Sequence, residues 1–173
     1  MHIISDLEQI QCDAERKEEE NELFVSFLKQ HSAIYIDDLV KELNHEVTPQ
    51  IDCTKCGNCC KTLMIQVEKI EIEKVSRTLN LTHKQFEDKY IESGSGDQQL
   101  MNMIPCAFLS GSKCSIYNER FSSCREFPAL EIPFFTKRLF TVFMHYGRCP
   151  IIFNVIEGLK INLKFNEASF QQD

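Results

Sequence analysis

The stretch DCTKCGNCCKTL, residues 52 to 63, places four cysteines within eight positions. They are Cys53, Cys56, Cys59 and Cys60, in the pattern C-x2-C-x2-C-C. Overlapping C-x2-C units bend the chain so that their thiolates face one point, which is the spacing of metal-binding knuckles. Gly57 suits the tight turn of a knuckle, because glycine adopts backbone angles that other residues avoid. The stretch therefore predicts a metal centre with cysteine ligands.

The spacing leaves the kind of centre open. C-x2-C-x2-C also holds [4Fe–4S] clusters in bacterial ferredoxins, where a remote cysteine followed by proline completes the set. Cys149 and Pro150 form such a pair. Cys59 and Cys60 are adjacent, and neighbouring side chains tend to point apart, so they serve different centres or only one is a ligand. Thiolates suit both zinc and iron, and the cofactor is expected to be Zn²⁺ or an iron–sulfur cluster.

A second set of cysteines follows at longer spacings. With the first set it makes eight thiols, which suits two four-coordinate sites or one cluster plus a reactive set. The candidate metal ligands are Cys53, Cys56, Cys59, Cys60, Cys106, Cys114, Cys124 and Cys149. Cys12 stands alone among polar residues, and we expect no role for it.

The residues beside these eight cysteines are more basic than the chain as a whole. Five neighbours are basic and one is acidic, whereas the whole chain has 26 acidic and 19 basic residues. Cations close to a thiol favour its thiolate form. The bias therefore supports an anionic, sulfur-rich centre. The basic neighbours are Lys55, Lys61, Lys113, Arg125 and Arg148.

Composition and charge exclude several classes of protein. The chain has 173 residues, 43% of them hydrophobic, and a net charge of −7. No basic run indicates nucleic-acid binding, and no apolar run reaches the roughly 18 residues of a membrane span. The N-terminus lacks the basic and apolar regions of a secretory signal. We therefore expect a cytoplasmic protein, in which the thiols stay reduced rather than forming disulfides.

Hydrophobic spacing predicts helices over residues 5–30, 36–47, 68–79, 81–91 and 150–158. Short strands are expected over residues 63–67, 100–104, 140–146 and 159–165. The expected fold class is α+β and α-rich: a small single domain with short strands around the metal centre and an N-terminal helical segment. The expected division is residues 1–48 for that segment and 49–173 for the cysteine-cluster domain. The N-terminal helices could bind a protein partner.

Three segments, CTKCGNCC, CAFLSGSKCSIYNERFSSCREFP and GRCP, resemble the YkgJ-like cysteine-cluster family, the CxxCxxCC zinc- or iron-chelating domain. Tyr117, Arg120 and Arg125 also match the pattern, while Ala107 and Phe121 stand where the family usually has proline. The resemblance covers about residues 50 to 155. It implies chelation of zinc or iron. A similar module occurs in flagellin lysine methylases, but this chain shows no methyl-donor motif.

Three functions remain open from the sequence. The first is a metal-binding protein with an iron–sulfur or zinc centre, used in redox chemistry or as an accessory to an enzyme. The second is a structural zinc module that mediates protein interaction, and the third is metal delivery or storage. The chain has no Ser-His-Asp order and no Gly-rich phosphate loop, so no catalytic residue is assigned. Arg125 is expected to pair with a local carboxylate such as Glu126 or Glu131.

Overall fold

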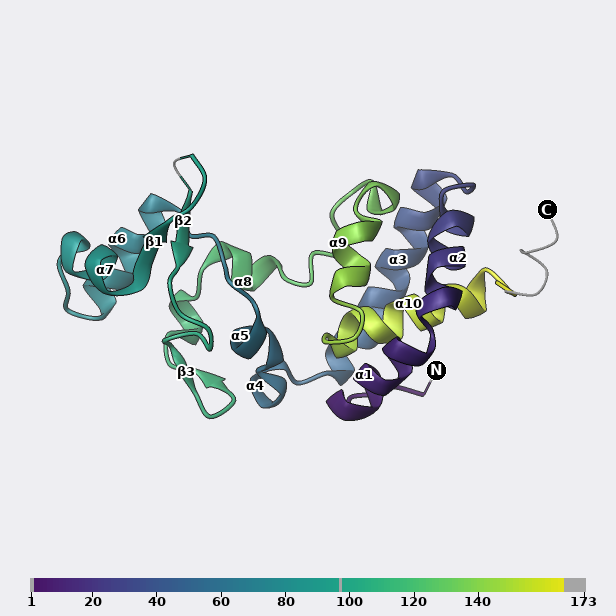
Figure 1. Ribbon diagram of the computed structural model, residues 1–173, viewed down its shortest axis with the longest axis horizontal. Helices are drawn as coiled ribbons and strands as arrows, with labels where there is room; N and C mark the ends of the chain where they lie inside the picture. The colour runs from purple at the N-terminus through teal and green to yellow at the C-terminus, as the bar shows by residue number, and fades with distance from the viewer. Residues whose placement is uncertain (1, 97, 167–173) are drawn as a thin grey trace. The chain divides into compact units, whose positions relative to one another are not determined.

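The structure is a computed structural model, described for residues 2–96 and 98–166 (Figure 1). It is mostly helical with two pairs of short strands, which confirms the expected α-rich α+β class. The chain forms two compact units. The residues up to Ile51 and those from Pro128 onward make the helical unit, and Asp52–Phe127 make the cysteine unit. The division into residues 1–48 and 49–173 stays a prediction, because packing alone does not show which parts fold independently.

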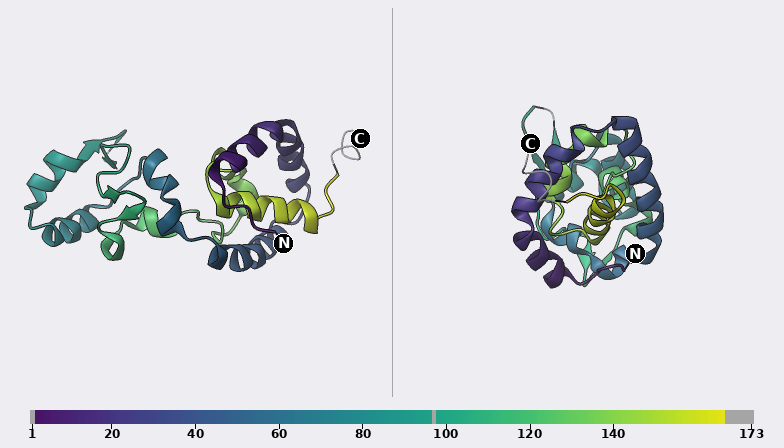
Figure 2. Two further views of the ribbon diagram at one scale, coloured as in Figure 1. Left: turned by 90° about the horizontal axis from the view of Figure 1, so that it is seen from below. Right: turned by 90° about the vertical axis from the view of Figure 1, so that its right-hand side faces the viewer.

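Helices make up the regular structure of the helical unit. They are α1 (Leu7–Arg16), α2 (Glu18–Leu28), α3 (Ala33–Val47), α9 (Leu139–Met144) and α10 (Pro150–Asn162), with 3-10 turns η1 (Thr48–Gln50) and η3 (Phe135–Lys137). The helix expected over residues 5–30 is two helices that meet at Lys17. Figure 2 shows α10 in yellow with the purple and blue helices α1 to α3 around it.

Two expected strands in this unit are helical instead. Residues 140–146 lie mostly in α9, where Val142 is buried and Phe140 is 84% exposed. Residues 159–165 begin within α10, which runs on to Asn162. Nearly every residue of α10 from Pro150 to Lys160 is buried. A helix that is apolar on all sides shows no 3.6-residue period, so its end could not be read from spacing.

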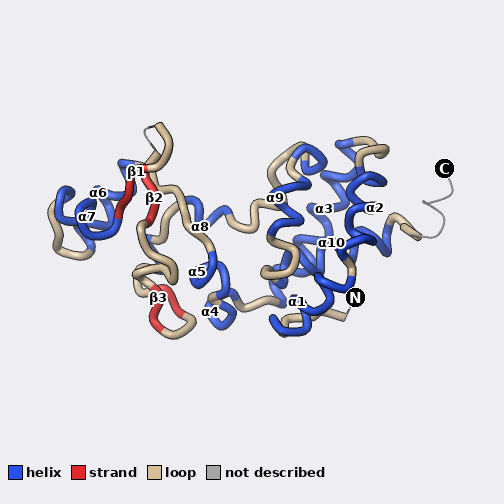
Figure 3. The backbone as a smooth tube through the Cα atoms, in the orientation of Figure 1, coloured by secondary structure: helices blue, strands red, loops and turns tan. Residues whose placement is uncertain are grey.

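Short elements make up the cysteine unit. They are α4 (Cys53–Cys56), α5 (Asn58–Thr62), α6 (Lys69–Thr78), α7 (His83–Tyr90), β1 (Ile91–Ser93), β2 (Gln99–Met101), β3 (Leu109–Ser110), β4 (Lys113–Cys114), η2 (Tyr117–Glu119) and α8 (Ser122–Glu126). Strands β1 and β2 pair antiparallel, as do β3 and β4. The strands of the described chain all lie in this unit (Figure 3). The strand expected over residues 63–67 is reduced to one bridge, between Gln66 and Leu100.

Helices α6 and α7 begin with reciprocal side-chain caps. Glu68 and Glu71 form a capping box on α6, and Thr82 and Gln85 form one on α7. Both pairs satisfy backbone N–H groups that a helix start leaves without partners. The helices expected over 68–79 and 81–91 are therefore confirmed with small shifts at their ends.

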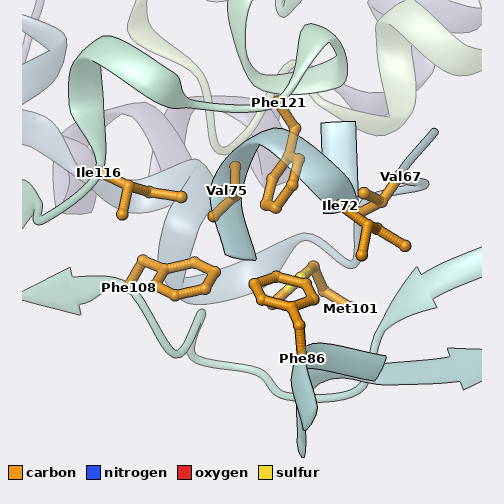
Figure 4. Packing of buried hydrophobic residues seen from close by; sticks show 8 residues of the cluster. All are labelled: Val67, Ile72, Val75, Phe86, Met101, Phe108, Ile116 and Phe121. Carbon is orange, nitrogen blue, oxygen red and sulfur yellow. The ribbon is translucent and has the colours of Figure 1, made fainter. Parts of the chain in front are cut away.

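An apolar core lies between these helices and the strands (Figure 4). Phe86, Phe108 and Phe121 are its aromatic members. Burying one such side chain contributes about 1.5–3 kcal/mol, so a few phenylalanines hold the unit around its two capped helices. The other members are Val67, Ile72, Val75, Met101 and Ile116.

None of the helices in the described part of the chain has both the length and the apolar character that crossing a membrane requires.

Candidate metal centre

Seven of the eight predicted ligands lie in the cysteine unit, on separate short segments. Helices α4 and α5 supply the first four, and the other three come from the segment before β3, from β4 and from α8. None of them is in a disulfide. The seven are Cys53, Cys56, Cys59, Cys60, Cys106, Cys114 and Cys124.

Helix α4 is a single turn with a cap at each end. Asp52 accepts hydrogen bonds from the Thr54 backbone N–H at 3.0 Å and from the Thr54 hydroxyl at 2.6 Å. Gly57 ends the turn with a left-handed backbone, φ 58°, and its N–H donates to the Cys53 carbonyl at 3.0 Å. A Cβ at Gly57 would lie 2.9 Å from the Ser112 carbonyl oxygen. The glycine expected in the knuckle is thus required by its φ and by the β3–β4 turn against it.

Backbone contacts join the first four cysteines to those that follow. The N–H of Cys106 donates to the Cys60 carbonyl at 2.8 Å. The Cys106 carbonyl accepts from Leu109, which pairs with Cys114 across the β3–β4 hairpin. The thiols of Cys59 and Cys60 are hydrogen-bonded to each other. These contacts gather segments that are about fifty residues apart in the chain.

Helix α8, which carries Cys124, is held by Glu71 of α6. The Glu71 carboxylate accepts from the Ser122 backbone N–H at 2.6 Å and from the Ser122 hydroxyl at 3.1 Å. It also pairs with Arg125 at 3.3 Å. The carboxylate partner of Arg125 is therefore Glu71, far away in sequence, and not a local residue such as Glu126 or Glu131. Helix α6, which also contributes Ile72 and Val75 to the apolar core, thus holds the helix that carries Cys124.

Burial disfavours ionisation of these thiols. It is the main cause that raises the pKa of Cys53, Cys106, Cys114 and Cys124, the last to about 12. The pKa of Cys60 is raised chiefly by its hydrogen bond with Cys59. Neighbouring thiols raise the values further, because thiolates repel one another. A bound metal cation would lower the pKa of these thiols and so stabilise their thiolate forms.

Arg120 is a cation close enough to the cluster to act on three of its thiols. Its charge acts to lower the pKa of Cys53, Cys114 and Cys124, opposing the effect of burial. Its guanidinium lies over the Tyr117 ring, 4.0 Å from the centroid, and donates to the Tyr117 carbonyl at 3.0 Å. Counting only the sequence neighbours of the cysteines missed Arg120. The signal that could have found it is its position four residues before Cys124.

Two of the basic residues that neighbour the cysteines in sequence form ion pairs with carboxylates. Lys55 is 84% exposed and pairs with Asp52 at 3.7 Å, and Arg125 pairs with Glu71. The sequence therefore indicated the right sign of charge near the thiols without indicating which side chain carries it.

The donor set fits a thiophilic metal. The sulfurs of Cys106 and Cys114 accept hydrogen bonds from the backbone N–H groups of Phe108 and Ile116, two residues further on. Such bonds stabilise the thiolates that hold zinc or iron–sulfur centres. Across the described residues, no three His, Cys, Asp or Glu side chains already converge closely enough to hold a metal ion. The cysteines share one unit, and their side chains would have to move closer together for an ion to bind.

A family model agrees with this donor set. The model for the CxxCxxCC family, described as "Putative zinc- or iron-chelating domain", matches residues 52–144, more than half of the chain. The chain belongs to this family. The matched segment of this CxxCxxCC protein contains all seven cysteines of the cysteine unit. Membership supports metal binding in general and names zinc and iron as the metals. No curated protein and no solved structure matches the chain.

The eighth predicted ligand of the CxxCxxCC protein lies in the helical unit. Cys149 is buried and immediately precedes α10. Its N–H donates to the His145 carbonyl at 3.0 Å, and its carbonyl accepts from Phe153 at 2.9 Å. Burial lowers the pKa of the His145 imidazole, and the charge of Arg148 lowers it further. The structure does not bring Cys149 into the same unit as the other seven.

Proposed function

We propose that the cysteine unit is a metal-binding module whose seven thiols hold a zinc or iron–sulfur centre, serving redox chemistry or supporting an enzyme. The observation that carries this proposal is the gathering of seven cysteines from separate segments, with backbone N–H groups aimed at two of the sulfurs. Arg120 and the apolar core behind the cluster support the same function, since one offsets negative charge and the other excludes water.

The centre is expected to stabilise the unit that holds it. Helices α4, α5 and α8 have only four or five residues, and β3 and β4 have two each. Elements this short are not stable in isolation. A metal that links them turns its binding free energy into folding free energy. Removing the metal should therefore loosen the cysteine unit.

Elemental analysis of protein purified and kept without oxygen tests the proposal. We expect zinc or iron bound to the protein, and, for iron, the visible absorption of an iron–sulfur cluster. Chelation should lower the melting temperature and increase hydrogen exchange in residues 52–127. A metal-free preparation with an unchanged melting transition after reduction would contradict the function.

A protein-interaction role is a second candidate, favoured by exposed apolar side chains in the N-terminal helices. Ile34 is 73% exposed and Tyr35 is 52% exposed, both at the start of α3. Their double exchange to aspartate should abolish co-purification of a partner with the tagged chain. Cys53→Ala should leave co-purification unchanged if the helices alone make the contact.

Metal delivery or storage is the third candidate. Cys53 is the exposed member of the cluster, so the ion that it holds would exchange more readily. Rapid transfer of bound zinc to a chelator of moderate affinity would support delivery, and slow release would oppose it. For every candidate we propose the reducing cytoplasm as the location, because none of the nine cysteines, all of which the structure describes, is in a disulfide.

A further inference from the structure

Three cysteines of the cysteine unit pack against its apolar core, and a fourth is joined to them. Cys106, Cys114 and Cys124 pack on the core residues, and Cys60 is joined to Cys106 by the 2.8 Å backbone hydrogen bond. Every pair of thiols among the four interacts electrostatically. We call Cys60, Cys106, Cys114 and Cys124 the core set.

The other three cysteines form a second group, in which Cys53 is exposed and Cys56 and Cys59 are half-buried. Cys53 and Cys56 share the single turn of α4, and their thiols interact electrostatically. Cys53 interacts with Cys60 as well, and the thiol of Cys59 is hydrogen-bonded to that of Cys60. We call Cys53, Cys56, Cys59 and Cys60 the rim set. Cys60 is thus a member of both sets.

The number of sulfurs matches a shared ligand. Zinc bound by cysteines is four-coordinate, and a thiolate sulfur has enough lone pairs to bind two ions. Two four-coordinate ions that share one sulfur need seven sulfur ligands, and the cysteine unit contains seven. We propose that the unit binds two divalent metal ions, one in the core set and one in the rim set, with Cys60 as the bridging ligand.

This inference rests on the proposed function and adds the number of ions and the role of Cys60. It also answers why Cys59 and Cys60 are adjacent: one completes the rim set, while the other joins the two ions. A shared thiolate reduces the negative charge by one relative to two separate four-thiolate sites, and Arg120 offsets part of the remainder. Rotation about the Cα–Cβ bond moves a cysteine sulfur without moving the backbone, so the ions can draw the gathered sulfurs inward.

Cadmium titration of the reduced full chain under anaerobic conditions tests the proposal. Native mass spectrometry should show two Cd²⁺ ions per chain. With ¹¹³Cd, the NMR spectrum should show two resonances that are coupled to each other through the shared sulfur. A single ion per chain, or two ions without coupling, would overturn the bridge and leave the proposed function intact. No bound ion at all would overturn both.

Single exchanges to alanine assign the ligands. Cys53→Ala should retain one ion, held by the core set, and Cys60→Ala should abolish the coupling and weaken both sites. Cys12→Ala, outside the cluster, serves as the control and should bind two coupled ions. Cys149→Ala should also bind two, because seven sulfurs suffice. Loss of one ion in Cys149→Ala would replace the bridged arrangement with two separate sites and overturn the proposal.

Discussion

The backbone N–H of Cys106 donates a hydrogen bond of 2.8 Å to the carbonyl of Cys60. This single contact connects the last cysteine of the local cluster to the first cysteine of the distant set. Cys106, Cys114 and Cys124, the three cysteines that follow in the cysteine unit, all pack against the apolar core.

Gly57→Ala should destabilise the cysteine unit by about 2–4 kcal/mol. Part of the loss is the left-handed backbone, which costs a residue with a Cβ about 1–2 kcal/mol, and part is the contact at 2.9 Å with the Ser112 carbonyl. Gly111→Ala is the matched control, since Gly111 has φ 64° with open space around it. Urea denaturation should show a larger loss for Gly57→Ala. Equal losses would mean that the contact with Ser112 is relieved without cost.

Glu71→Gln should weaken the attachment of α8 to α6 and lower the free energy of unfolding by about 1.5–3 kcal/mol, the range for a hydrogen bond to a charged group. The Glu71 side chain is only 14% exposed, so water replaces its contacts poorly. Glu73→Gln removes a carboxylate from the same helix that is 55% exposed and pairs with Arg77. That control should change stability by less than about 1 kcal/mol. Similar effects of the two exchanges would rule out a special role for Glu71.

Arg120→Gln should weaken metal binding by about tenfold, within the range for residues next to metal ligands. The guanidinium charge opposes the burial that raises the pKa of Cys53, Cys114 and Cys124. Arg120→Lys keeps the charge and should recover part of the affinity. Lys55→Gln should leave the affinity nearly unchanged, because Lys55 is exposed and already pairs with Asp52. Competition with a zinc indicator measures all three, and equal affinities of Arg120→Gln and the native protein would refute the prediction.

Glu157→Gln should destabilise the helical unit and make its stability depend less on pH in the acidic range. Burial acts to raise the pKa of Glu157, but hydrogen bonds and charge from Lys17, Lys160 and Tyr146 hold it below the ordinary value of 4.5. The folded state therefore favours the carboxylate, and its stability contribution is present above pH 4.5 and lost as the pH falls through the lower folded value.

Removing one partner of a buried ion pair leaves the other charge uncompensated. We expect a loss of about 2 kcal/mol near neutral pH, less than for full burial, since Lys160 keeps its contact with Glu20 at 2.9 Å. Glu22→Gln, at an exposed position of α2, is the control. Thermal unfolding between pH 3 and 7 should converge for the native protein and Glu157→Gln at the acid end. Parallel curves would show that Glu157 does not titrate differently in the two states.

Local signals predicted the elements whose evidence lies within a few residues. Apolar periods found α6 and α7, and Gly57 marked the knuckle turn. Apolar alternation misled us at Phe140 and Val142, because side chains two apart can also lie on different faces of a short helix. The nearly complete burial of α10 removed the period that would have shown its length.

By itself, the sequence determined the donor chemistry: cysteine spacing and the match of residues 52–144 indicate a zinc- or iron-chelating domain. Only the tertiary structure decided that Arg120 lies close enough to act on the thiols, that Glu71 holds the helix of Cys124, and that seven cysteines share one unit while Cys149 lies in the other. The physical reason is that spacing reports which residues a turn brings together within a few positions. Partners some fifty residues apart meet because an apolar core forms between them, and that packing leaves no local pattern in the chain.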